Sequence, residues 1–206
     1  MQTEIAILQN IIIKRLPSQL LRPALLFILL SVTTLVFATE KEESNSNFLI
    51  KNLATRLVDN VFMVDVEQEI NLNKTVIEAL VNGVPITLET QFSVYTESWY
   101  MSTTILNLSQ KYKINYHALS QQYILTNLNT EKQLSFSSLH RVLATLSKIT
   151  DIPLVDKNLL PKNEELYIKV RNQLDIGSLP LPLRATAYFS SSWRLKSDWA
   201  TWILKE

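Results

Sequence analysis

The stretch "VFMVDVEQEINL", residues 61–72, decides the fold class of this 206-residue chain. Its side chains alternate between apolar and polar. The apolar set is Phe62, Val64, Val66, Ile70 and Leu72, and the polar set is Asp65, Glu67, Glu69 and Asn71. A period of two is typical of a β-strand that buries one face and exposes the other. Residues 61–72 therefore predict a half-buried strand.

The same alternation recurs along most of the remaining chain. Further strands are predicted at residues 86–94, 104–117, 121–128, 134–136 and 166–176. The last of these has Tyr167, Lys169, Arg171, Gln173 and Asp175 on its polar face. An amphipathic helix is predicted at about residues 138–150, because Leu139, Val142, Leu143, Leu146 and Ile149 form one apolar stripe at helical spacing. Long strands with one polar face favour a mainly β protein, with an α+β fold as the alternative. We expect an antiparallel β-sandwich, loosely immunoglobulin-like, with the helix packed on it.

Residues 1–38 have the pattern of a secretory signal peptide. Basic residues (Lys14, Arg15 and Arg22) precede an uncharged apolar run at 24–37, and short side chains at Val36 and Ala38 fit the site that a signal peptidase reads. Cleavage is predicted between Ala38 and Thr39. The run has 14 residues, whereas a membrane span needs roughly 20. The alternative is an uncleaved anchor that holds the protein in the inner membrane through residues 24–37.

Two further regions are predicted after the leader. Residues 39–60 are interpreted as a polar spacer and lead-in, and residues 61–206 as a single β-rich domain. The domain ends in a strap that contains Leu, Pro and Trp. Its "LPLPL" stretch, residues 179–183, is expected to lie extended over the domain with its leucines inserted into the core.

Composition excludes several classes of function. The leader holds three of the 20 basic residues and one of the 19 acidic residues, which leaves 17 against 18 in the rest of the chain. This near-neutral balance argues against a nucleic-acid partner, which selects for a basic face. The chain has no cysteine, so thiol chemistry and disulfides are excluded.

No catalytic, metal-binding or cofactor-binding residue is predicted. The two histidines, His117 and His140, fall on different predicted elements, and neither has a second histidine at ligand spacing. The alternation of residues 104–117 places His117 on the polar face of its strand. This placement favours a structural role, in which the imidazole ring is hydrogen-bonded to a neighbouring strand or loop. The predicted interaction surface instead consists of His117, Arg184, Trp193 and Trp199. Arginine and tryptophan are residue types favoured at interfaces.

Several motifs resemble a family of exported bacterial proteins, the domain-of-unknown-function family 4390, described as proline-rich signal-peptide proteins. The motifs are "NGVPITLETQFSVY", "KYKINYHALSQQYILTNLNT", "IPLVDKNLL" and "LYIKVRNQLDIGSLPLPLRATAYFSSSWRLKSDW". The resemblance covers roughly residues 61–202. It implies one domain after a signal peptide and genes that lie beside those of a membrane sensor kinase and its response regulator. It implies no activity.

The leading hypothesis is therefore a non-catalytic binding or protein-interaction module in the periplasm of a Gram-negative bacterium. Its expected partner is an envelope or inner-membrane protein, such as an envelope sensor that it assists. Nucleic acid is not an expected partner, and membrane contact is expected only through an uncleaved leader. The alternative is a periplasmic carrier of a small apolar or lipid ligand, and a third hypothesis is an enzyme with an unrecognised site.

Overall fold

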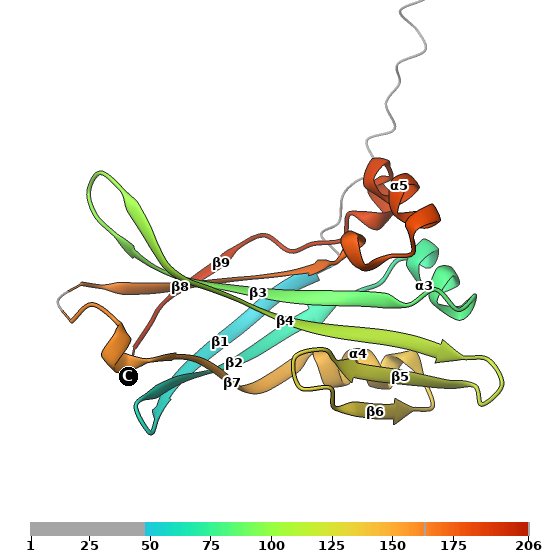
Figure 1. The fold of residues 1–206 in the computed structure, drawn as a ribbon, viewed down its shortest axis with the longest axis horizontal. Coiled ribbons are helices and arrows are strands. Elements are labelled where there is room, and N and C mark those ends of the chain that lie inside the picture. Colours follow the sequence, from blue (N-terminus) through green and yellow to red (C-terminus); the bar gives the residue numbers. More distant parts are fainter. Residues whose placement is uncertain (1–47, 163, 206) are drawn as a thin grey trace, which may run out of the picture. The chain divides into compact units, whose positions relative to one another are not determined.

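Two antiparallel β-sheets form the framework of residues 48–162 and 164–205, the part of the chain that the computed structural model describes (Figure 1). The three-stranded sheet has the order β1 (Phe48–Val58), β2 (Val61–Ile70), β7 (Lys148–Asp156). The six-stranded sheet has the order β6 (Gln133–Phe136), β5 (Gln122–Asn127), β4 (Ser102–His117), β3 (Ile86–Glu97), β8 (Leu166–Leu174), β9 (Ala200–Ile203). The predicted mainly β, sandwich-like arrangement of antiparallel sheets is confirmed.

Helices and short 3-10 turns connect the strands. The helices are α3 (Lys74–Val81), α4 (Leu139–Leu146) and α5 (Leu181–Phe189), and the turns are η1 (Lys157–Leu159), η2 (Ile176–Ser178) and η3 (Ser191–Trp193). The Asn73 side chain accepts a hydrogen bond from the Val76 amide at the start of α3, as an N-cap does. Beyond the end of α3, Gly83 has a φ of +87°, a conformation that favours glycine.

Two hydrophobic clusters fill the inner face of the six-stranded sheet. The first lies under the helices and includes Val76, Leu80, Ile86, Ile114, Val142, Leu146, Leu179, Ala187 and Trp193. The second lies between the two sheets and includes Phe62, Val64, Val66, Phe92, Val94, Ile152, Ile168 and Val170. The helices therefore cover one half of the six-stranded sheet and the three-stranded sheet covers the other. Figure 1 shows β1, β2 and β7 crossing the long strands β3, β4 and β8 at an angle.

A buried polar belt separates the two clusters. It consists of Gln68 on β2, Thr90 on β3 and Asn172 on β8, which are 3%, 2% and 1% exposed. Asn172 Nδ2 donates to Gln68 Oε1 (3.1 Å), and Gln68 Nε2 donates to the Leu146 carbonyl at the end of α4 (2.8 Å). The belt thus joins both sheets and one helix by hydrogen bonds.

Strand β1 occupies a segment that sequence analysis treated as lead-in. It is 11 residues long and pairs with β2 along its whole length. Its buried residues Phe48, Ile50 and Leu53 do not keep one parity, because the pairing shifts between Ile50 and Asn52 as in a β-bulge. The domain therefore begins before Val61. The earlier part of the predicted spacer, residues 39–47, lies outside the described residues.

Two predicted elements near the C-terminus differ in the structure. The helix predicted at about 138–150 ends at Leu146, and Ile149 belongs to strand β7. The predicted extended strap is wrong over residues 181–183, where α5 begins. Proline is tolerated in the first turn of a helix, because the amide that it lacks has no partner there. Leu179 is buried, as expected, but Leu181 is 75% exposed.

Candidate functional site

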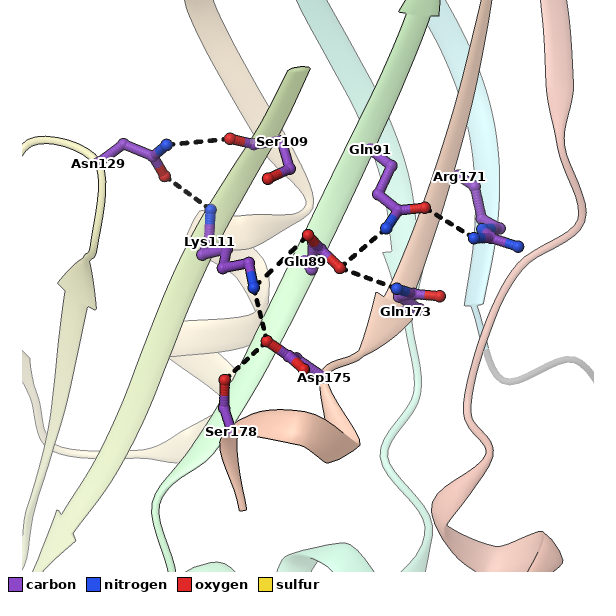
Figure 2. A network of polar contacts seen from close by, with 9 residues as sticks. All are labelled: Glu89, Gln91, Ser109, Lys111, Asn129, Arg171, Gln173, Asp175 and Ser178. Carbon is purple, nitrogen blue, oxygen red and sulfur yellow. Dashed lines mark hydrogen bonds and ion pairs between the residues drawn. The ribbon is translucent and has the colours of Figure 1, made fainter. Parts of the chain in front are cut away.

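The outer face of the six-stranded sheet, which points away from both clusters, carries a row of polar and charged side chains. Pairing of β3 with its two neighbours places Glu89 between Lys111 on β4 and Gln173 on β8. The next outward residue of β3, Gln91, lies between Ser109 and Arg171 in the same way. Paired residues on adjacent strands share a face of the sheet. Figure 2 shows the side chains of Glu89, Gln91, Lys111, Arg171 and Gln173 joined into one network by hydrogen bonds and an ion pair.

One end of the network is an ion cluster around Lys111. Its Nζ lies 2.8 Å from Asp175 Oδ2 and 3.7 Å from Glu89 Oε1. Although burial alone would raise the pKa of Asp175, hydrogen bonds from Lys111 and Ser178 hold that pKa below its ordinary value. The hydrogen bond to Asp175 raises the pKa of Lys111. Lys111 and Asp175 are therefore charged at neutral pH and engaged with one another, and Glu89 lies beside the same Lys111 Nζ.

Two amides carry the network from this ion cluster to Arg171. Gln91 Nε2 and Gln173 Nε2 both donate to Glu89 Oε2, at 2.9 Å and 2.8 Å. This orientation of Gln91 turns its Oε1 toward Arg171, whose Nη2 donates to it at 2.7 Å. The Glu89 carboxylate therefore fixes the orientation of the Gln91 amide. The Gln91 oxygen in turn positions the Arg171 guanidinium.

The other end is the cation–aromatic cluster, formed by Tyr95, Lys169, Arg171 and Trp199. Lys169 Nζ lies 5.2 Å from the ring centroids of both Tyr95 and Trp199. The Arg171 guanidinium carbon lies 4.5 Å from the Trp199 centroid. These distances are in the range of cation–π attraction, which contributes about 0.5–1 kcal/mol at exposed sites. Within residues 48–162 and 164–205, no carboxylate lies within ion-pair distance of Lys169 or Arg171.

A shift in strand pairing places Trp199 in this cluster. Gln173 pairs with Lys196 and Val170 with Ala200, so three steps along β8 correspond to four along the C-terminal segment. One extra residue on one strand is the mark of a β-bulge, which re-aims side chains. Ser197 fixes the segment just before it: its amide donates to the Asn172 carbonyl (2.8 Å), and its Oγ accepts from the Asn172 amide (3.0 Å).

The structure places the four residues of the predicted interaction surface in different surroundings. Trp199 is 41% exposed and belongs to the cation–aromatic cluster, whereas Trp193 is 5% exposed and packs in the first hydrophobic cluster. Trp193 is therefore not available to a partner. Arg184 donates two hydrogen bonds to the Leu179 carbonyl (2.9 and 3.1 Å), which attach α5 to the residue before it. His117 is exposed at the end of β4. The predicted cleavage site, Ala38 and Thr39, lies outside the described residues.

The chemistry that this face offers is recognition by charge and by aromatic surface. The carboxylates of the network, Glu89 and Asp175, are held by Lys111, by Ser178 and by amides, and the half-buried cations Lys169 and Arg171 lie on aromatic rings. No group of three or more metal-ligating side chains comes together anywhere in the part of the chain that the structure describes. The alternation of residues 166–176 predicts that Lys169 and Arg171 lie on the polar face of a strand. It does not associate them with Trp199, since that association depends on the bulge.

Comparison with known proteins places the chain in a family. The model of the domain of unknown function DUF4390 matches residues 45–203. The chain belongs to this family. The match begins ahead of β1, in agreement with a domain that includes that strand. No curated protein and no solved structure matches the chain. Among the described residues of this DUF4390 domain, no helix has the length and apolar character required to span a bilayer.

Proposed function

We propose that this DUF4390 domain is a non-catalytic protein-interaction module of the bacterial periplasm, which contacts its partner through the cation–aromatic cluster. The observation that carries the proposal is the pair of cations, Lys169 and Arg171, that lie against aromatic rings without a carboxylate partner in the described chain. A protein surface that serves only solubility does not need a hydrogen-bonded network to orient an arginine. Arginine and tryptophan are also the residue types most enriched among energetically dominant interface positions.

Export is the second part of the proposal, and the leader supports it. Basic residues, a short apolar run and the Val36-Phe37-Ala38 site together favour secretion to the periplasm. The partner proposed is then an envelope or inner-membrane protein, such as a sensor that the module assists. N-terminal sequencing of the protein purified from a periplasmic fraction is expected to begin within two residues of Thr39. Recovery of the full chain in washed membranes would instead support the anchor formed by residues 24–37.

Photo-crosslinking in the native host tests the interaction surface directly. A benzophenone amino acid replaces Thr201, which is exposed and pairs with Lys169 on the outer face. Two other exposed positions serve as matched comparisons: Trp99 at the β3–β4 turn (96% exposed) and Leu181 on α5 (75% exposed). We expect one discrete adduct from position 201, and its loss when Arg171 is also replaced by glutamine.

The comparison positions make the outcome decisive. Adducts from position 99 or 181, with none from position 201, would move the interaction to the β3–β4 turn or to α5 and overturn the proposed surface. An adduct from 201 that persists in the Arg171→Gln background would show contact that does not depend on the cation, and would also contradict the proposal. Thermal melts of each variant confirm that the domain remains folded.

A further inference from the structure

We infer that the cation–aromatic cluster binds an extended acidic peptide segment of a partner protein, with two carboxylates spaced two residues apart on Lys169 and Arg171. This inference rests on the proposed function and adds the chemistry of the partner. It is carried by the spacing of the two cations, by the donors that they leave free, and by the aromatic surface beside them.

The spacing comes from the strand itself. Lys169 and Arg171 are two residues apart on β8 and point to the same face, so their Cα atoms are separated by about 6.6 Å. An extended peptide has the same period, with alternate side chains on one face. Acidic residues at positions i and i+2 of such a peptide therefore match both cations at once.

The free donors are defined by the hydrogen bonds already made. On Arg171, Nη2 is occupied by Gln91 Oε1, and Nε is buried without a partner in the described chain. No described residue accepts from Arg171 Nη1, and Nη2 uses only one of its two N–H groups on Gln91, so these donors remain for a ligand. Lys169 Nζ likewise has ring neighbours and no acceptor among the described residues. Hydrogen bonds between charged groups are stronger than neutral ones, which favours carboxylate over amide at both positions.

The aromatic surroundings favour a peptide over a free anion. The Tyr95 and Tyr167 rings stack at 5.5 Å, and Trp199 and Ile203, 41% and 40% exposed, lie along the same outward face. Flat, partly exposed rings beside a cation provide apolar contact for the stem of a glutamate and for the side chains between two glutamates. The carboxylates of the same network, Glu89 and Asp175, are held by Lys111, by Ser178 and by amides, and Glu165 accepts from the Tyr167 hydroxyl (2.7 Å). None of these three carboxylates forms an ion pair with Lys169 or Arg171.

Binding of designed peptides to the full chain tests this inference. The probes are three fluorescein-labelled dodecapeptides. The first has glutamates at alternate positions, the second has glutamines at those positions, and the third has the same number of glutamates placed consecutively. Fluorescence anisotropy is expected to rank the alternating glutamate peptide first. Lys169→Gln and Arg171→Gln are each expected to weaken its binding by about fivefold, the upper end for a partly exposed ion pair. Affinity should fall as salt is raised.

Matched variants separate charge recognition from unfolding. Lys132→Gln removes an exposed lysine from the loop between β5 and β6 and should leave affinity unchanged. Arg171→Lys keeps the charge and should retain most of the binding, even though it removes the guanidinium that contacts Gln91. Lys169→Gln breaks no hydrogen bond in the described chain, so it remains informative if the Arg171→Gln variant unfolds.

The outcomes distinguish this inference from the proposed function. Equal affinity for the glutamate and glutamine peptides, or equal weakening by Lys132→Gln, overturns the acidic-peptide site. Displacement of the peptide by inorganic phosphate at low millimolar concentration overturns the peptide as the source of the anion. A crosslink from position 201 without peptide binding refutes the ligand chemistry but leaves the interaction surface standing. Peptide binding without any crosslink refutes the proposed surface in the cell.

Discussion

The cations Lys111, Lys169 and Arg171 lie on the outer face of the six-stranded sheet, and their surroundings give them different roles. Lys111 is held by Glu89 and Asp175, whose side chains are 11% and 15% exposed. Lys169 and Arg171 lie on aromatic rings instead. A cation between two largely buried carboxylates stabilises the fold, because removing it leaves negative charge that water reaches only in part. A cation on a ring keeps its charge available to a partner. The same residue type thus supports structure at one position and recognition at another.

Replacing Lys111 by methionine tests the structural role. The change leaves Glu89 and Asp175 without their shared cation, so the free energy of unfolding at pH 7 should fall by about 1–3 kcal/mol. Lys113→Met, two residues along the same face of β4, is the matched control and should stay within about 0.5 kcal/mol of the wild type. Urea denaturation of the three proteins measures both values. Equal effects of the two changes would contradict a specific role for Lys111.

The pH dependence of this effect has a definite sign. The pKa of Asp175 is lowered in the folded protein, so the stability that it contributes is complete above its unfolded pKa of about 3.9 and is lost as pH falls through the folded pKa. In the Lys111→Met protein, Asp175 loses the hydrogen bond from lysine, so burial becomes the larger influence and favours the protonated Asp175 carboxyl. The stability difference between wild type and variant should therefore narrow as pH falls from 7 to 3. A difference that stays constant over this range would exclude the shared ion cluster.

At the scale of elements, α5 shows how one side chain can be buried and its neighbour exposed within the same motif. Leu179 precedes the helix and is 1% exposed, in the first hydrophobic cluster, whereas Leu181 begins the helix and points outward. Leu179→Ala should lower the free energy of unfolding by about 2–5 kcal/mol, the cost of truncating a buried leucine. Leu181→Ala should change it by less than about 0.5 kcal/mol. Thermal and urea denaturation distinguish the two, and a large effect at Leu181 would restore the extended strap.

The elements that sequence analysis predicted are those whose pattern is regular. Strands β2, β3, β4 and β8 alternate cleanly, and α4 has a single apolar stripe. Strand β1 was missed because a bulge after Ile50 changes the parity of its buried residues. Helix α5 was missed because a Leu-Pro repeat satisfies both an extended segment and the first turn of a helix. Only the packing of Leu179 and Ala187 in the core decides between them.

The candidate site was predictable in part for a related reason. Trp199 was selected from its residue type, and Lys169 and Arg171 were placed on a polar strand face by their alternation. Alternation specifies a face but not which residues of two strands lie side by side. That register depends on the pairing of β8 with β3 and on the bulge before β9, which result from packing across the whole sheet.

At the scale of the whole described domain, the buried polar belt divides the interior into two hydrophobic clusters. Gln68 lies between Val66 and Ile70 on the apolar face of β2, and Asn172 lies between Val170 and Leu174 on β8. Burying amides costs free energy unless each finds a partner. The hydrogen bond between Asn172 and Gln68 forms only when the two sheets pack in one relative placement. We expect the belt to fix that placement, since apolar contacts alone tolerate sliding by two residues.

A double-mutant cycle at Gln68 and Asn172 tests this role. Gln68→Leu removes the partner of both Asn172 and the Leu146 carbonyl, so the free energy of unfolding should fall by about 1–3 kcal/mol. Adding Asn172→Leu replaces the stranded amide, whose Oδ1 has no partner among the described residues even in the wild type, and should recover part of the loss. The expected coupling is at least about 0.5 kcal/mol, measured by urea denaturation of the four proteins. Strictly additive effects would contradict direct pairing between Gln68 and Asn172.

The double variant also tests whether the belt fixes the placement of the two sheets. Its interior is more apolar, so the sheets can pack in more than one relative placement at similar stability. We therefore expect broadened amide resonances in its nuclear magnetic resonance spectra, whereas sharp resonances like those of the wild type would contradict this role of the belt.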